Sequence, residues 1–208
     1  GMLAARTAKV VAEPVAVEPV TTTSNKPSMT LAEAKGEATA TRWTKKGREL
    51  AEMYDPEASA RLSDDEVGAL YGYTTDPGYT EANMALRGKI AMTPERQAYI
   101  AHINQGLDKL DPYEGVTLRG TDLPAEVLAK NQVGEIVSDP AFLSSDIEKG
   151  FKGPTQITID GKSGRQIDFL SQYKSMNETE VLFKPGTKFE VLERTDVDGT
   201  TYLKYKEL

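Results

Sequence analysis

The chain has 208 residues, a hydrophobic fraction of 38% and a formal net charge of −7, which is the composition of a globular protein with room for one domain and some extra sequence. The acidic balance disfavours nucleic acid as a partner, because nucleic-acid binding needs a basic face. The absence of cysteine and the single histidine exclude disulfides, thiolate metal sites and multi-histidine metal sites. We therefore expect no bound metal. No apolar run approaches the ~18 residues that span a membrane, so we also expect no membrane partner.

The first 38 residues differ in composition from the rest of the chain. The stretch AEPVAVEPVTTTSNKPS contains three prolines and no aromatic residue, so it can bury little apolar surface. We therefore predict a disordered tail or linker over residues 1–38 and a folded domain over residues 39–208.

Residues 39–111 carry the signals of helices. Ser63, with Glu66 three residues later, forms a capping box. Thr80 and Thr93 are further predicted N-caps, and Thr93 is followed by a proline at the first helical position. The last segment repeats apolar residues on one helix face: Tyr99, Ile103, Leu107 and Leu110.

The first of these helical segments, WTKKGRELAEMY, combines one large aromatic residue with several cations. Trp43 is predicted to anchor the helix in the core. Lys45, Lys46 and Arg48 are predicted to form a solvated face, because a run of charges on a helix is usually exposed to water.

From Val116 onward the sequence changes character. Short β-branched or alternating runs, such as GVTLRG, TQITID and KFEVLER, are separated by glycine, proline and aspartate. These runs predict strands, with one short helix near PAEVLAK. Helices followed by strands are typical of an α+β domain rather than a doubly wound sheet.

Polar residues stand at three strand ends in this region: Arg119 in TLRG, Ser144 and Ser145 in FLSSD, and Glu178 and Glu180 in ETEVLF. Strand residues two apart point to the same face, so the two glutamates should project together. Like charges held close together repel, and a cation such as a guanidinium would relieve that repulsion. Any one of these features alone is typical of an ordinary protein surface. The three features in this order are a more specific signal of a functional site.

Together these features resemble the mono-ADP-ribosyltransferase family, in the branch marked by an Arg, Ser-Thr-Ser, Glu-x-Glu signature. Arg119 stands at the Arg element, Ser144 leads the Ser element, and Glu178 and Glu180 form the carboxylate element. The following VLFKPGTKFEVL and the upstream LYGYTTDPGYTEANMALRG are similar to the family's strand ending and helical segment. The resemblance extends from about residue 45 to the end, and Asp146 departs from it by replacing the third serine.

The resemblance implies an α+β fold in which N-terminal helices pack on a mixed β core of two sheets. It also implies that NAD+ is the substrate and that ADP-ribose passes to a protein arginine, with no metal. Glu180 would stabilise the positive charge that develops on the ribose carbon. Glu178 would orient the incoming guanidinium and accept its proton. Ser144 would hold Glu180 in place.

The resemblance further implies which residues bind NAD+. Arg119 would pair with a phosphate, whose geometry suits a guanidinium. The backbone of Gly120 would meet the nicotinamide amide, since glycine allows a close approach. Phe151 would stack on the ligand, Lys152 would contact a phosphate, and Ser145 is grouped with these cofactor-binding positions.

The loop LSQYKSMN resembles the family's loop that recognises the target, with Tyr173 as its aromatic residue and Asn177 beside the first glutamate. The expected partners are NAD+ and a host or target protein with an accessible arginine. We expect a monomeric toxin, effector or phage-encoded enzyme that is secreted or delivered into a target cell. The alternatives are an NAD+ glycohydrolase or a transferase to another acceptor, and a non-catalytic phage structural or binding module.

Overall fold

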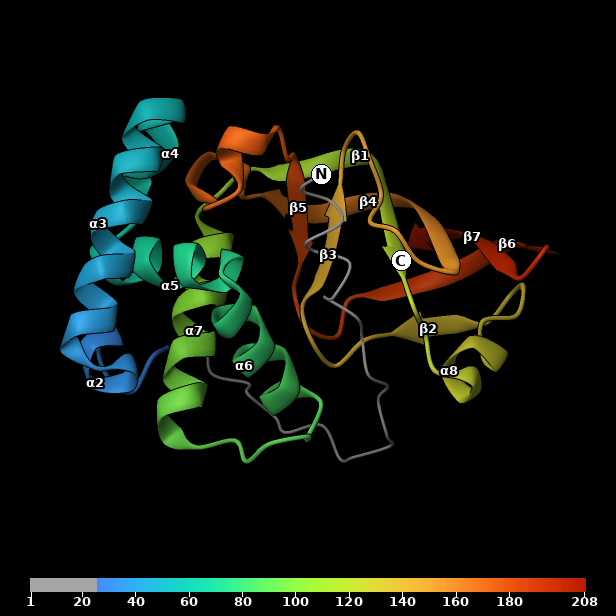
Figure 1. Cartoon of the computed structure of the whole chain (residues 1–208), viewed down its shortest axis with the longest axis horizontal. Coiled ribbons are helices and arrows are strands. Elements are labelled where there is room, and N and C mark those ends of the chain that lie inside the picture. Colours follow the sequence, from blue (N-terminus) through green and yellow to red (C-terminus); the bar gives the residue numbers. More distant parts are fainter. Residues whose placement is uncertain (1–25) are drawn as a thin grey trace. The chain divides into compact units, whose positions relative to one another are not determined.

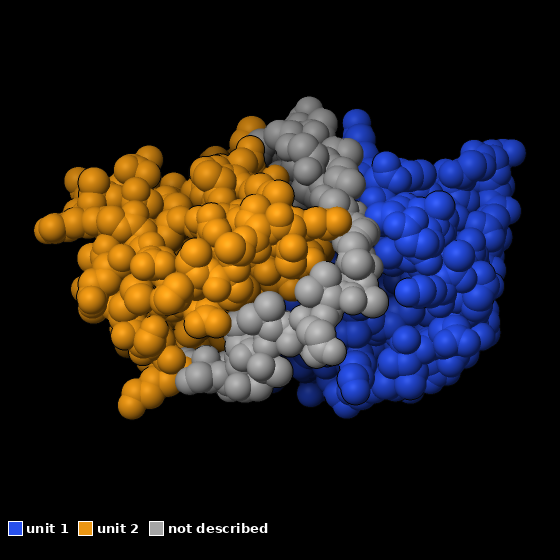
Figure 2. Space-filling view, turned by 90° about the horizontal axis from the view of Figure 1, so that it is seen from below, with its two compact units in different colours: residues 1–16, 112–166, 179–208 blue, residues 17–111, 167–178 orange. Residues whose placement is uncertain are grey.

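A computed structural model of the chain describes residues 26–208 (Figure 1). Contacts divide this part of the chain into two compact units, coloured separately in Figure 2. Residues 26–111 and 167–178 form the helical unit, and residues 112–166 and 179–208 form the strand unit. The division interrupts the last third of the sequence, because residues 167–178 leave the strands and join the helices.

The helical unit consists of α-helices joined by short turns, followed by two 3-10 turns from the later segment. Its elements are α2 (Leu31–Lys35), α3 (Glu37–Tyr54), α4 (Pro56–Arg61), α5 (Asp64–Thr74), α6 (Asp76–Leu86), α7 (Pro94–Asp108), η2 (Asp168–Leu170) and η3 (Lys174–Met176).

Two of the three predicted N-cap residues are confirmed. The side chains of Ser63 and Thr93 accept hydrogen bonds from backbone amides of α5 and α7, and the Ser63 capping box is complete. The prediction of Thr80 as an N-cap is wrong. α6 begins at Asp76, because the hydroxyl of Thr75 accepts a hydrogen bond from the amide of Gly78 and a proline occupies the first turn.

The first described helix begins at Leu31, within the segment that was predicted to be a tail. Residues 31–38 lie in α2 and the first turn of α3, so the expectation of a tail up to residue 38 needs correction there. Thr30 and Glu33 form a reciprocal capping box, and Leu31 is fully buried. α2 contacts α3 and α7, and this packing stabilises a helix too short to be stable alone. Of the remainder of the predicted tail, residues 26–30 lie before α2 and outside any helix or strand, and residues 1–25 lie outside the described residues.

Trp43 lies in the core of the helical unit, as predicted. Its ring is 5.7 Å from the ring of Tyr99, and its side chain is 5% exposed. A Cβ atom on Gly72 of α5 would lie 2.3 Å from the Trp43 ring, so the glycine permits α3 and α5 to approach closely. This close packing fixes α3 on α5.

The strand unit contains seven strands and one short helix. Its elements are β1 (Pro112–Thr121), α8 (Ala125–Ala129), β2 (Ile136–Ser138), β3 (Leu143–Asp146), β4 (Thr155–Gln166), β5 (Glu180–Phe183), β6 (Lys188–Val197) and β7 (Thr200–Glu207). Hydrogen bonds connect the strands in the order β1-β3-β5-β4-β7-β6-β2, and β1 also pairs with β4.

The pairings of β4 explain how this sheet is organised. β4 runs parallel to β7 and antiparallel to β1 and β5, so the sheet is mixed, as expected. The expected two sheets are joined into one network of seven strands. β1 and β4 pair with each other, β1 also pairs with β3, and β4 also pairs with β5 and β7. On the inner face of this network the core is formed by apolar side chains that alternate along the strands: Ile157, Ile159, Val181, Phe183, Phe189, Val191, Leu203 and Tyr205.

None of the helices within residues 26–208 has the length and apolar character needed to cross a bilayer.

Candidate active site

Ser144 and Glu180 meet on neighbouring strands of the strand unit. β3 and β5 run antiparallel with Ser144 opposite Leu182. Glu180 stands two residues before Leu182 and therefore projects to the same face as Ser144. The Ser144 hydroxyl donates a hydrogen bond to Oε2 of Glu180, and both side chains are almost completely buried. This is the contact that the sequence predicts for the leading serine, and it holds the carboxylate in one orientation.

Asp146 occupies the place of the family's third serine and acts as a hydrogen-bond acceptor for two segments. Its carboxylate accepts from the amide nitrogens of Glu148 and Lys149, at 2.9 and 3.0 Å. It also accepts from the amide and the hydroxyl of Thr179, at 2.9 and 2.6 Å. The side chain is 2% exposed. The substitution therefore creates a junction between the end of β3 and the residue that separates the two glutamates.

Arg119 braces the strand that carries Ser144. Its Nη1 atom donates to the backbone oxygen of Ser144 at 2.8 Å, and the residue is 4% exposed. The guanidinium lines a cavity of about 50 Å³ together with Ile157 and Tyr205. Burial raises the pKa of Tyr205, and the positive charge of Arg119 offsets part of this rise. Arg119 thus faces the core side of β1 at this point and supports the Ser element.

Gly120 is held against the loop that follows β3. A Cβ atom at Gly120 would lie 1.4 Å from the backbone oxygen of Phe151, so no other residue fits without a backbone shift. The Phe151 ring is buried, at 2% exposed, whereas Lys152 is exposed. The loop therefore presents the lysine to solvent, and the phenylalanine contributes to packing.

Ser145 does not share the surface of Ser144. Successive strand residues point to opposite faces, and the Ser145 hydroxyl donates to the backbone oxygen of Val181 at 2.9 Å. Ser145 is fully buried. The resemblance groups Ser145 with the cofactor-binding positions, whereas in the structure its hydroxyl supports the pairing of β3 and β5.

The loop predicted to recognise the target belongs to the helical unit. The amide of Gln172 donates to the hydroxyl of Thr74 at 3.1 Å, and the Tyr173 hydroxyl donates to Oδ1 of Asp76 at 3.1 Å. These bonds tie the loop to the end of α5 and the start of α6. Asn177 adopts the left-handed conformation, with φ of 59°, which turns the chain ahead of the glutamates.

The two glutamates fall in different units. Glu178 ends the helical unit and is 2% exposed, whereas β5 begins at Glu180. Strand alternation therefore applies to Glu180 and does not determine where Glu178 points. The residues predicted for NAD+ lie in the strand unit and those predicted for the acceptor lie in the helical unit.

Two residues with supporting roles were not predicted from the sequence. Asp76 accepts the hydrogen bond of Tyr173, and its position in the TTDPGY turn is the only local signal for it. Gln156 donates through Nε2 to the backbone oxygens of Phe151 and Gly153, which holds the loop after β3, and nothing in its sequence neighbourhood indicates this. Within residues 26–208, no group of three or more histidine or acidic side chains is arranged to hold a metal ion.

Comparison with known proteins identifies the family. Residues 40–208 match the family model described as ADP-ribosyltransferase exoenzyme. The chain belongs to this family. The match covers both units and includes every candidate site residue discussed above.

The family contains relatives with considerable sequence identity. A protein from Serratia proteamaculans, named NAD(+)--protein-arginine ADP-ribosyltransferase Tre1, is 47% identical over 203 residues, which are 98% of this chain and 45% of that protein. A protein of the same name from Pseudomonas putida is 46% identical over 183 residues, 86% of this chain and 36% of that protein. The chain thus spans less than half the length of these two curated relatives.

Solved structures share the fold. Exoenzyme S from Pseudomonas aeruginosa, solved with human 14-3-3 protein beta and carba-NAD, is 27% identical with a TM-score of 0.63, and the match covers 82% of this chain and 88% of that one. The Vis toxin of Vibrio splendidus, an ADP-ribosyltransferase, is 22% identical with a TM-score of 0.62, covering 83% and 86%. The expected α+β fold of ADP-ribosyltransferases is therefore confirmed.

Proposed function

We propose that the chain is the catalytic part of an NAD+-dependent mono-ADP-ribosyltransferase that modifies arginine in a protein. The observation that carries this proposal is the hydrogen bond from Ser144 to the buried carboxylate of Glu180, on strands braced by Arg119. The names of the two relatives at 46 and 47% identity support the choice of arginine as acceptor.

Two features of the strand unit fit NAD+ as the substrate. The Cα of Gly120 packs directly against the backbone oxygen of Phe151, so the loop after β3 lies over this strand position, and we propose that the Gly120 backbone meets the nicotinamide carboxamide there. Lys152 on the neighbouring loop is exposed and offers a positive charge to a phosphate. NAD+ supplies a ribose whose bond to nicotinamide breaks, with nicotinamide as the leaving group.

Glu180 is the residue that stabilises the positive charge developing at the ribose carbon. Its carboxylate is already oriented by the Ser144 hydroxyl, so little reorganisation is needed when that charge appears. Arg119 contributes by fixing the backbone of Ser144, and its proposed contact with a phosphate is the second part of its role.

Glu178 is the residue that receives the acceptor. We propose that its carboxylate orients the guanidinium of the target arginine and takes the proton lost when the new carbon–nitrogen bond forms. Tyr173 and Asn177, in the loop before it, contact the protein that carries this arginine. The bond from Tyr173 to Asp76 supports this role because it fixes the loop on the helices.

We further propose that the enzyme acts in a target cell into which it is delivered, and that it acts as a monomer. A relative 30% identical over 146 residues is named Secreted exoenzyme S, which supports delivery out of the producing cell. One chain contains the residues proposed for both substrates, which supports a monomer.

The test is to incubate the purified chain with labelled NAD+ and the guanidine compound agmatine, and separately with an arginine-containing protein. We expect nicotinamide release, labelled agmatine and, by mass spectrometry, ADP-ribose on arginine. Release of nicotinamide without any labelled guanidine would identify a glycohydrolase instead, and the absence of both products would contradict the proposal.

A further inference from the structure

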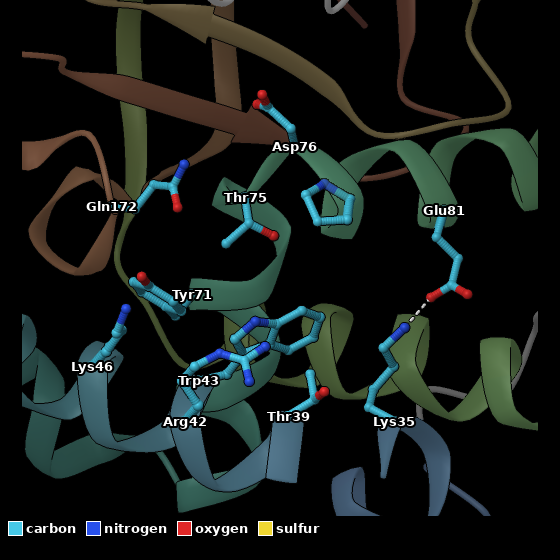
Figure 3. A pocket seen from close by; sticks show the side chains of 11 residues that line it. Lys35, Thr39, Arg42, Trp43, Lys46, Tyr71, Thr75, Asp76, Glu81 and Gln172 are labelled. Carbon is cyan, nitrogen blue, oxygen red and sulfur yellow. Dashed lines mark hydrogen bonds and ion pairs between the residues drawn. The ribbon is translucent and has the colours of Figure 1, made fainter.

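The helical unit contains a cavity of about 540 Å³ that the proposed catalytic residues do not use (Figure 3). Arg42 and Lys46 of α3 line one side of it, and Asp76 and Gln172 line the opposite side. Its wall includes the buried ring of Trp43. Residues from α3, from the start of α6 and from the loop predicted to recognise the target (residues 170–177) therefore surround the cavity.

The charges on the α3 side of this cavity are not neutralised. Arg42 and Lys46 stand four residues apart and so lie on the same helix face. Both are exposed, and among residues 26–208 no carboxylate lies within ion-pair distance of either. The sequence predicts only a solvated face for Lys46, whereas the structure places it among the residues that line this cavity.

The carboxylates of the cavity are already engaged. Glu81 forms an ion pair with Lys35 and a second one with Arg96 at 3.4 Å. Asp76 accepts the hydrogen bond of the Tyr173 hydroxyl. Among the lining residues, three cations (Lys35, Arg42 and Lys46) and two carboxylates (Asp76 and Glu81) leave the cavity a net charge of +1, although the chain as a whole carries a net charge of −7.

The walls of the cavity are rigid. Trp43 and Tyr71 are each 5% exposed and belong to the core between α3 and α5. The ammonium of Lys35 lies 5.5 Å from the centre of the Trp43 ring, which fixes the lysine beside Glu81. Burial raises the pKa of Tyr71, and the nearby charge of Arg42 offsets part of this rise. A ligand entering here meets a preformed site.

The cavity is close, along the chain, to the acceptor side of the proposed active site. Gln172, which lines the cavity, directly precedes Tyr173, and Glu178 lies six positions after Gln172 along the chain. Six extended residues reach at most about 20 Å, and the 3-10 turn within this segment shortens the path. An acceptor whose arginine lies at Glu178 can therefore reach the cavity with a residue about five positions away.

We propose that this cavity binds an acidic side chain of the acceptor protein, close in sequence or space to the arginine that is modified. This inference rests on the proposed function. A carboxylate in the cavity pairs with Arg42 and Lys46, and the rigid wall sets its position. Because the chain is acidic overall, an acidic acceptor gains here an attraction that most of the surface does not offer.

The experiment compares three acceptors with the same enzyme: agmatine, an arginine peptide with two glutamates about five residues from the arginine, and the same peptide with glutamines in their place. We expect the wild type to modify the glutamate peptide with a kcat/KM about three- to tenfold higher than the glutamine peptide, as for one or two exposed ion pairs. The preference should shrink as salt is added.

Substitutions of the lining cations test whether the preference for the glutamate peptide arises at the cavity. Arg42→Glu and Lys46→Glu, alone and combined, should abolish it, and the combined variant should favour a peptide with lysines in place of the glutamates. Lys45→Glu is the matched control, because Lys45 lies beside Lys46 on α3 but does not line this cavity. It should retain the preference for the glutamate peptide.

The inference is overturned if the wild type modifies both peptides equally, or if the combined variant keeps the preference. Agmatine separates this result from a failure of the proposed function. Agmatine labelled at equal rates by wild type and variants, with no peptide preference, contradicts only the cavity. No labelling of any acceptor by the wild type contradicts the proposed function as well.

Discussion

Thr179 donates two hydrogen bonds to Asp146, one from its amide to Oδ2 at 2.9 Å and one from its hydroxyl to Oδ1 at 2.6 Å. Thr179 separates the two glutamates of the Glu-x-Glu element, so the bonds fix this element to the end of β3. The same carboxylate accepts from the amides of Glu148 and Lys149. A serine, with its single hydroxyl oxygen, has too few acceptor sites to replace it.

Replacement of Asp146 should therefore impair both stability and activity. In Asp146→Ala, two half-buried donors of Thr179 lose their acceptor, and we expect a loss of about 2–3 kcal/mol in the free energy of unfolding. Nicotinamide release should fall about tenfold or more, because Glu180 directly follows Thr179. Urea unfolding and a nicotinamide assay measure the two effects.

The hydroxyl of Thr179 provides a graded control for this prediction. Thr179→Val keeps the amide bond to Asp146 and removes only the hydroxyl bond, so its cost should be near 1 kcal/mol. Full activity and stability in Asp146→Ala would show that the junction has no role in positioning the glutamates.

The two glutamates should have separable effects. Glu180→Ala removes the carboxylate that we propose faces the ribose, and we expect nicotinamide release and arginine labelling to fall together by about 10²–10³-fold. Glu178→Ala should reduce arginine labelling far more than NAD+ hydrolysis, because water needs no guanidinium site. Nicotinamide release and ADP-ribosylated arginine should be measured in each variant. Equal losses of the two products in Glu178→Ala would argue against the acceptor role of Glu178.

Adjacent serines on opposite faces of β3 offer a matched pair of variants. Ser144→Ala removes the hydroxyl that donates to the buried Glu180 carboxylate, and we expect nicotinamide release to fall about tenfold, with a loss of about 1–3 kcal/mol in the free energy of unfolding. Ser145→Ala loses the bond to Val181, and we expect about 1 kcal/mol of lost stability with activity nearly intact. The reverse pattern would support the original assignment of Ser145 to NAD+ binding.

Gly120 should tolerate no side chain. Gly120→Ala places a Cβ atom 1.4 Å from the Phe151 carbonyl oxygen, so the loop after β3 must move. We expect a higher KM for NAD+ and a lower kcat. Gly186→Ala is the control: its φ is +80°, so an alanine is strained by about 1 kcal/mol, but nothing lies within 4 Å of the added atom. Its KM for NAD+ should match the wild type.

Several features were predictable because they depend on near neighbours in the sequence. The capping box at Ser63 joins residues three apart, and the alternation of Ile157 and Ile159 follows from the strand itself. The helical start at Leu31 was missed because its stability comes from packing on α3 and α7, which composition does not reveal. Thr80 was mistaken for a cap because Thr75, with proline two residues later, competes for the same helix.

The sequence by itself indicated the family, because the order of Arg119, Ser144 and Glu180 is a property of the chain. Only the tertiary structure decided how Asp146 is used, since strand register brings it to a residue 33 positions away. Tertiary structure also placed Lys46, predicted to lie on a solvated face, beside Arg42 on one side of a cavity. The physical reason is common to both cases: hydrogen bonds and cavities between distant segments depend on how strands and helices pack, and local sequence patterns do not encode that packing.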